Sequence, residues 1–161
     1  MTVASLFPAP DHDHGRCSSE AMAQAETVCA KRRQRLTPIR RQVMEALLTS
    51  HRPLGAYEII ELMAGEDGPP APITVYRALD FLRENGLVHR IESRNAFIAC
   101  VHNHESGAFV VFLICEKCGT VGEALSAAAA QTLRSAARGA GFTPKTPVVE
   151  IVGVCANCRE A

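Results

Sequence analysis

Two cysteine pairs with the spacing C-x-x-C constrain the fold of this chain more than any other feature. The first pair is CEKC at 115–118 and the second is CANC at 155–158. The spacing lets both thiolates of a pair reach one ion from a single turn, and four thiolates in a tetrahedron suit Zn²⁺. We therefore expect a closed, structural zinc site that pins the C-terminal strand to its sheet. Its ligands would be Cys115, Cys118, Cys155 and Cys158.

Two other interpretations of these cysteines are possible. They could be unrelated buried or redox-active thiols, or they could hold an iron–sulfur cluster. Zinc is favoured because the two pairs match and because each lies at the end of a predicted strand. Gly119 directly after the first pair also suits a backbone that folds tightly around the sulfur.

The remaining composition limits the compartment and the partners. No apolar run in the 161 residues approaches the roughly 20 needed to span a bilayer, and the N-terminus does not resemble a signal peptide. We predict a cytoplasmic protein without a membrane partner, where seven cysteines indicate metal rather than disulfides. The 17 basic and 17 acidic residues balance, but residues 31–41 carry only basic charge. The simplest interpretation of that run is a solvated helix face.

The first half of the sequence predicts helices followed by a hairpin. Residues 1–18 lack periodicity and are expected to be a disordered tail, in which His12 and His14 could contact a metal but are more simply solvated. Helices are predicted at 19–35, from 38 to the break SHRPLG at 50–55, at 56–63 and at 73–85, with strands at 87–92 and 96–100. Thr37 and Pro38 suit the start of the second helix, and Gly86 suits the end of the fourth. This order predicts a winged helix-turn-helix domain over residues 19–92.

The second half has a different pattern. A strand is predicted at 107–115, an alanine-rich helix at 123–138 and another strand at 146–155. We therefore predict a small α/β domain over residues 93–161 and an α+β class for the whole chain.

A second set of metal-binding residue types lies outside the cysteine pairs. It comprises His89, Cys100, His102, His104 and Glu123. His89 and Cys100 fall on the two arms of the predicted hairpin, whereas Glu123 falls in the other half of the chain. Taken singly, His89 could be a surface histidine and Cys100 a small buried apolar residue. Together they could share an ion that sets the angle between the two halves.

Several motifs resemble the ferric uptake regulator family, and most closely its zinc-sensing branch, the zinc uptake regulators. They are LTPIRRQVMEAL, AYEIIELM, TVYRALDFLRENGLVHRIES and the two C-x-x-C pairs. The resemblance covers nearly everything from Ser19 to Arg159. It implies a bacterial homodimeric repressor whose winged helix binds DNA and whose C-terminal domain dimerises. It also implies two zinc ions per chain, one structural and one regulatory at the hinge.

The resemblance also implies the ligands of the regulatory zinc. His89, Cys100 and Glu123 match the branch's pattern, but its fourth ligand, a histidine nearer the first cysteine pair, has no counterpart between Glu105 and Cys115. His104, or alternatively His102, is expected to replace it. A thiolate ligand favours zinc over iron or manganese.

Contacts to DNA are predicted from the fourth helix, which is second in the helix-turn-helix and should enter the major groove. With its apolar face inward, Thr74, Arg77 and partly Tyr76 face outward. Arg77 can contact guanine O6 and N7, although a salt bridge with Asp80 or Glu84 is the alternative. The basic run, with Arg35 and Arg40, would hold phosphates, and the resemblance adds Tyr57 as a DNA contact.

These observations predict a zinc-responsive repressor of zinc-uptake genes, with zinc as corepressor and a palindromic double-stranded operator as partner. Neither enzymatic activity nor a small-molecule substrate is expected. One alternative is a sister regulator that senses iron, manganese or peroxide. The other is a zinc hydrolase, which is not favoured because no H-E-x-x-H or H-x-E motif occurs.

Overall fold

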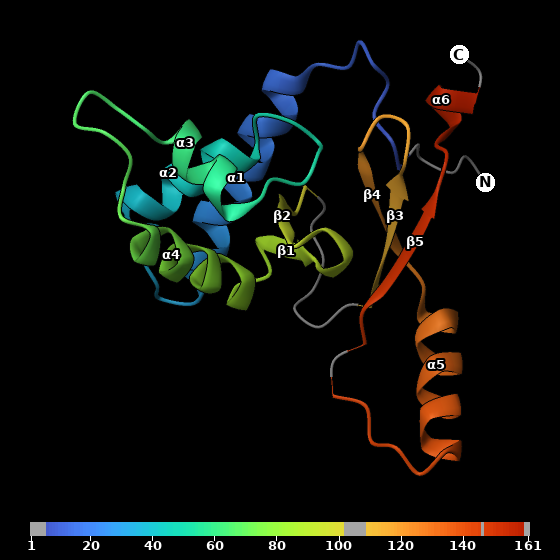
Figure 1. Cartoon of the computed structure of the whole chain (residues 1–161). Coiled ribbons are helices and arrows are strands. Elements are labelled where there is room, and N and C mark those ends of the chain that lie inside the picture. The colour runs from blue at the N-terminus through green and yellow to red at the C-terminus, as the bar shows by residue number, and fades with distance from the viewer. Residues whose placement is uncertain (1–5, 102–108, 146, 160–161) are drawn as a thin grey trace. The chain divides into compact units, whose positions relative to one another are not determined.

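The computed structural model describes residues 6–101, 109–145 and 147–159. The chain divides into two compact units. We call residues 11–106 the helical unit, and residues 1–10 with 107–161 the sheet unit. Figure 1 shows α1–α4 and a hairpin in the first, and the sheet of β3, β4 and β5 with α5 in the second. No helix within the described ranges is long and apolar enough to cross a membrane.

The helical unit has the element order that the sequence predicts for a winged helix. Its elements are α1 (His14–Lys31), α2 (Pro38–Leu47), α3 (Ala56–Leu62), α4 (Pro72–Glu84), β1 (Val88–Ile91), the 3₁₀ turn η1 (Glu92–Arg94) and β2 (Ala96–Ala99). Strands β1 and β2 pair antiparallel, with Val88 opposite Ala99. The turn between them closes through Asn95, whose φ of 46° is left-handed. The predicted helix-turn-helix and wing are therefore confirmed.

One apolar core holds the helical unit together. Helix α4 contributes its entire predicted inner face, namely Val75, Ala78, Leu79 and Leu82. In α2, Met44 joins the buried residues and Ile39 is only half-buried. Pro38 and Pro72 start their helices at positions where no backbone N–H is needed. Gly86 leaves α4 with a φ of +68°, a conformation that favours glycine.

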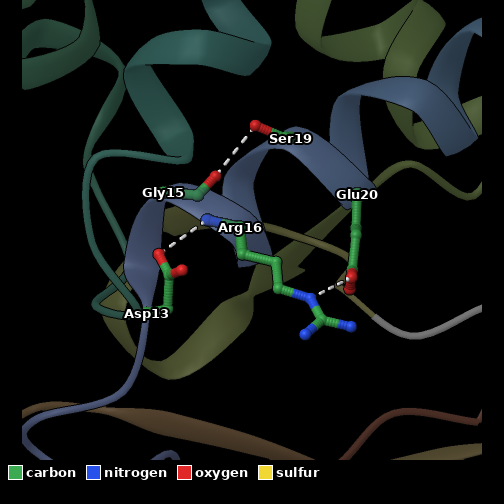
Figure 2. Close-up of polar contacts among 5 residues, drawn as sticks. All are labelled: Asp13, Gly15, Arg16, Ser19 and Glu20. Carbon is green, nitrogen blue, oxygen red and sulfur yellow. Dashed lines mark hydrogen bonds and ion pairs between the residues drawn. The ribbon is translucent and has the colours of Figure 1, made fainter.

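Helix α1 begins at His14, inside the segment that lacks sequence periodicity, and ends at Lys31 rather than near residue 35. A side-chain cap fixes its start, because Asp13 Oδ1 accepts a hydrogen bond of 3.0 Å from the backbone N–H of Arg16. Figure 2 shows this cap, the Ser19 hydroxyl donating to Gly15 O at 2.9 Å, and the Arg16–Glu20 ion pair at 2.8 Å. The residues that make these contacts are polar or glycine and leave no apolar periodicity in the sequence. The start of α1 was therefore not predicted.

The sheet unit contains β3 (Val110–Cys115), β4 (Val121–Leu125), α5 (Ala127–Gly139), β5 (Val149–Gly153) and α6 (Ala156–Arg159). The strand order is β4-β3-β5, with β3 antiparallel to β4 and parallel to β5. Strands β3 and β5 were predicted, but β4 was missed, and the predicted helix at 123–138 was wrong at its start. Ser126 caps α5 by accepting from Ala129 N at 3.2 Å, and the preceding residues pair with β3.

The N-terminal segment of the sheet unit packs against β4 and α6. The Asn157 side-chain amide donates to Pro8 O at 3.0 Å. A Cβ at Gly122 would lie 3.1 Å from Leu6 O and 3.2 Å from the Phe7 ring. Glycine at this position therefore lets the segment approach the strand.

Candidate metal centres and nucleic-acid interface

The four paired cysteines converge at one end of the sheet unit. Cys115 ends β3, Cys155 follows β5, Cys118 lies in the turn after β3 and Cys158 lies in α6. Their sulfur atoms all lie within 4.8 Å of one another. The Cys118 and Cys155 sulfurs are 3.9 Å apart, close to the roughly 3.8 Å separation of thiolates around a tetrahedral Zn²⁺ with bonds of about 2.3 Å. This separation is far longer than the roughly 2.0 Å of a disulfide.

The backbone shapes this cluster for thiolates. Gly119, with a φ of +78°, donates its N–H to Cys115 O at 2.9 Å, and the N–H of Cys155 points at the Cys115 sulfur at 3.4 Å. Backbone N–H groups of Cys118 and Cys155 lower the pKa of Cys115 to about 6. A hydrogen bond with Cys155 raises the pKa of Cys158 to about 12. A divalent ion would let all four thiolates coexist, so the cluster fits zinc.

The hairpin of the helical unit brings His89 and Cys100 together. His89 lies on β1 opposite Ile98, and Cys100 directly follows β2. Their ligand atoms lie within 4.8 Å of one another. Cys100 is buried, and its N–H donates to Leu87 O at 2.9 Å. The wing thus presents an imidazole and a thiol that can bind one ion.

Glu123, another predicted ligand, belongs to the sheet unit. Glu123 lies on β4 of the sheet unit opposite Phe112, where its side chain is only 4% exposed. A buried carboxylate is costly unless a cation or hydrogen-bond donors compensate it. His102 and His104 lie outside the described residues, so the preference for His104 stays a prediction.

A third group of ligands was not predicted. His12 and His14 approach His51, which follows α2, and the ligand atoms of the three residues lie within 4.8 Å of one another. The solvated tail expected for His12 and His14 is wrong here, because both side chains are half-buried. The D-H-D-H run at residues 11–14 was the sequence signal for a metal site. His51 could not be added to it from the sequence, because it lies far from His12 and His14 along the chain.

The outer face of α4 carries the predicted base-contacting residues. Thr74 and Arg77 are exposed, and Tyr76 is 41% exposed rather than part of the core. In the described part of the chain no ion pair involves Arg77, and Asp80 instead lies 3.7 Å from Arg83. The alternative of an Arg77–Asp80 salt bridge is therefore not favoured. A groove between α2 and α4 is lined by Thr37, Ile39, Arg40, Thr74, Arg77 and Ala78.

Some arginines of the basic run at residues 31–41 make contacts within the protein, whereas others are exposed. Arg32 donates to Glu84 O and Asn85 Oδ1 at the end of α4, and Arg41 pairs with Glu26. Arg40 stacks on the Phe81 ring, 3.3 Å from its centroid, and donates to Arg35 O at 2.7 Å.

Two other predicted contact residues have exposed side chains. Arg35 is exposed, as is Tyr57 on α3 at 71%. The predicted contacts Arg35 and Tyr57 are therefore both accessible to solvent.

Comparison with known proteins assigns these features to a family. The model of the ferric uptake regulator family matches residues 31–152. The zinc uptake regulation protein of Escherichia coli (strain K12) is 36% identical over 143 residues, covering 89% of this chain and 84% of that protein. A solved zinc uptake regulator complexed with zinc and DNA matches with a TM-score of 0.81 at 36% identity, covering 89% of this chain and 95% of its own. Holo XcZur matches with a TM-score of 0.80 at 40% identity, covering 89% and 99%. This chain belongs to the ferric uptake regulator family.

Proposed function

We propose that this chain is a zinc-responsive DNA-binding repressor of zinc-uptake genes, with zinc as its corepressor. The observation that carries the proposal is one compact unit that combines an outward-facing Arg77 on α4 with the His89–Cys100 pair on the wing. The similarity to a zinc uptake regulator complexed with zinc and DNA supports this assignment. A sulfur ligand disfavours the sister regulators that sense iron or manganese.

The two zinc sites would have different tasks. Cys115, Cys118, Cys155 and Cys158 would hold a structural ion that joins the ends of β3 and β5. His89, Cys100 and Glu123 would hold the regulatory ion, with His104 or His102 as fourth ligand. Because these ligands come from both units, filling the site would restrict how the units move relative to each other.

Dimerisation would use the sheet unit. It exposes large apolar side chains, among them Phe142 at 64%, Ile151 at 52% and Val152 at 57%. An exposed apolar surface of this kind marks an interaction site, and a two-fold homodimer is the commonest assembly. Two symmetric copies would place their α4 helices on half-sites about 34 Å apart, so a palindromic operator is expected.

Regulation would follow from a shift between hinge conformations. Bound zinc would supply directed bonds that are available only when His89, Cys100 and Glu123 lie together. In that conformation both α4 helices of a dimer would reach successive major grooves. A change from 1:99 to 99:1 requires about 5.5 kcal/mol of preference for the binding conformation, which a set of four ligands can supply.

The proposed function predicts that DNA binding depends on zinc. Purified protein, titrated onto a palindromic operator in a gel shift, should bind when zinc is present and release the DNA after mild chelation. One zinc equivalent per chain should be lost with the DNA affinity. Equal activation by iron or manganese, or binding that ignores chelation, would contradict the proposal and favour a sister regulator. A zinc hydrolase would show hydrolytic activity in the same preparation, and the expected lack of such activity stays a prediction.

Base reading by Arg77 gives a second prediction. Arg77→Ala should weaken operator binding by about 1–3 kcal/mol, because a bidentate contact to guanine is lost, whereas non-specific DNA binding should change little. Arg138→Ala on α5 is the matched control, since it removes the same charge from the sheet unit. Fluorescence anisotropy with operator and scrambled duplexes measures both affinities. Equal losses on the two duplexes would assign Arg77 to the phosphate backbone.

A further inference from the structure

We propose that His12, His14 and His51 form a third metal site, which takes a borderline transition ion such as Zn²⁺. The site lies wholly within the helical unit and shares no residue with the cysteine cluster or with the proposed regulatory ligands. It therefore stands independently of the proposed repressor function. Three ring nitrogens, one from each histidine, would bind the ion.

These nitrogens converge on a common centre. His51 Nε2 is 2.9 Å from His12 Nε2 and 3.3 Å from His14 Nδ1. Imidazole nitrogens bound at about 2.0–2.1 Å to a tetrahedral Zn²⁺ lie roughly 3.3–3.4 Å apart. The ring planes of His14 lie at 85° and 76° to those of His12 and His51. The ring planes of His12 and His51 are tilted by 50°, so none of the three pairs is stacked face to face.

A hydrogen bond outside the centre orients His14. Its Nε2 lies 2.8 Å from the carbonyl oxygen of Leu48. A carbonyl only accepts, so Nε2 carries the hydrogen and Nδ1 keeps its lone pair toward the other two histidines. Metal-binding histidines characteristically donate their second N–H to such an acceptor, which fixes the tautomer and raises the basicity of the ligand atom.

Protons alone satisfy this arrangement poorly. His51 Nε2 faces two ring nitrogens but can carry a single hydrogen, and His14 Nδ1 is already assigned as an acceptor. Adding a proton to a second ring would place two N–H groups or two positive charges against each other at about 3 Å. One divalent ion accepts all three lone pairs at once. The nitrogen set is therefore better matched to a cation than to hydrogen bonding.

Local structure holds both ligand-bearing segments. Asp13 lies between the two N-terminal histidines and caps α1 through the Arg16 N–H, as Figure 2 shows. The turn that carries His51 is closed by Ser50, whose hydroxyl accepts from Arg52 N at 3.2 Å. Because both segments are already ordered, metal binding would cost little conformational entropy, and this favours binding.

The ligand chemistry sets the class of ion and its consequence. Three neutral imidazoles suit Zn²⁺, Ni²⁺ and Cu²⁺, and half-burial of all three rings leaves access for a fourth ligand such as water. A bound ion would tie the start of α1 to the turn after α2, and both helices contribute residues to one core. Binding only to the folded state would raise the stability of the helical unit.

The test uses the full-length chain with Cys100→Ser, so that the proposed regulatory site is weakened while the structural cysteines are kept. Calorimetric titration should show that this protein binds one equivalent of Zn²⁺ per chain at the histidine site. The binding should disappear when His51→Gln is added to Cys100→Ser. It should persist in the control Arg52→Ala, which alters the exposed neighbour. Zn²⁺ should also raise the thermal unfolding midpoint of the control and not of His51→Gln.

Identical zinc stoichiometry and identical midpoint shifts in His51→Gln and Arg52→Ala would overturn the proposal. If His51→Gln does not fold, as judged by circular dichroism, His12→Gln replaces it, because His12 precedes α1 and lies outside the core. Retention of the equivalent in His12→Gln and in His14→Gln would overturn the proposal equally. Failure of zinc-dependent DNA binding would leave these outcomes unchanged, so the two proposals fail separately.

Discussion

Replacing Cys118 with serine is expected to remove one zinc equivalent per chain and to unfold the sheet unit. Among the described residues of this unit, few apolar side chains are buried: Val111, Phe112, Ile114, Val121 and Ala130, besides Cys115 and Cys155. Structural zinc binding contributes about 10–16 kcal/mol in small zinc domains, comparable with the whole stability of a typical domain, about 5–15 kcal/mol. A hydroxyl at position 118 cannot replace the thiolate, so most of that free energy is lost.

Metal analysis, sedimentation and circular dichroism measure this effect. The variant should lose zinc, dimer and strand signal together, while the helical unit retains its helices because its core is separate. Cys17→Ser is the matched control, since Cys17 is a half-buried thiol on α1 and belongs to none of the three metal-binding groups. A folded, dimeric Cys118→Ser protein with full zinc content would show that the cluster has no structural role.

Cys100→Ser is expected to have the second large effect, a loss of zinc-dependent DNA binding in a protein that remains folded. Loss of a residue that merely supports a ligand weakens metal binding about 10–100-fold, so removal of a ligand should cost on the order of 100-fold or more. Cys100 is 3% exposed at the end of β2, and serine fills nearly the same volume. The hairpin should therefore persist while the soft ligand is lost.

Gel shifts at buffered free zinc, combined with circular dichroism, separate this result from unfolding. Cys29→Ser serves as the control for replacing a buried thiol, because Cys29 lies in the core of the helical unit and not near a ligand group. Cys29→Ser should lower the thermal stability of the protein and leave the zinc dependence of DNA binding unchanged. Equal damage from Cys100→Ser and Cys118→Ser would contradict the division into regulatory and structural zinc.

Local sequence signals identified most of the helical unit. Period and caps located α2 and α4, since Pro38 and Gly86 act through backbone conformations that each residue fixes by itself. The apolar period also identified which face of α4 is buried, and so which residues point outward. The C-x-x-C spacing is equally local, because each pair reaches an ion from one turn.

Errors arose where pairing between distant segments decides the conformation. Val121–Leu125 ends in helix-forming residues, yet hydrogen bonds to β3 make it strand β4. Glu123 was assigned to a helix for the same reason.

The sequence by itself determined the helix-turn-helix, the wing and the matched cysteine pairs, because spacing along the chain encodes period, caps and ligands within a single turn. Only the tertiary structure decided that His51 meets His12 and His14. That meeting depends on how α1 and the turn after α2 pack around one core, and no local pattern records a contact between residues so far apart in the chain.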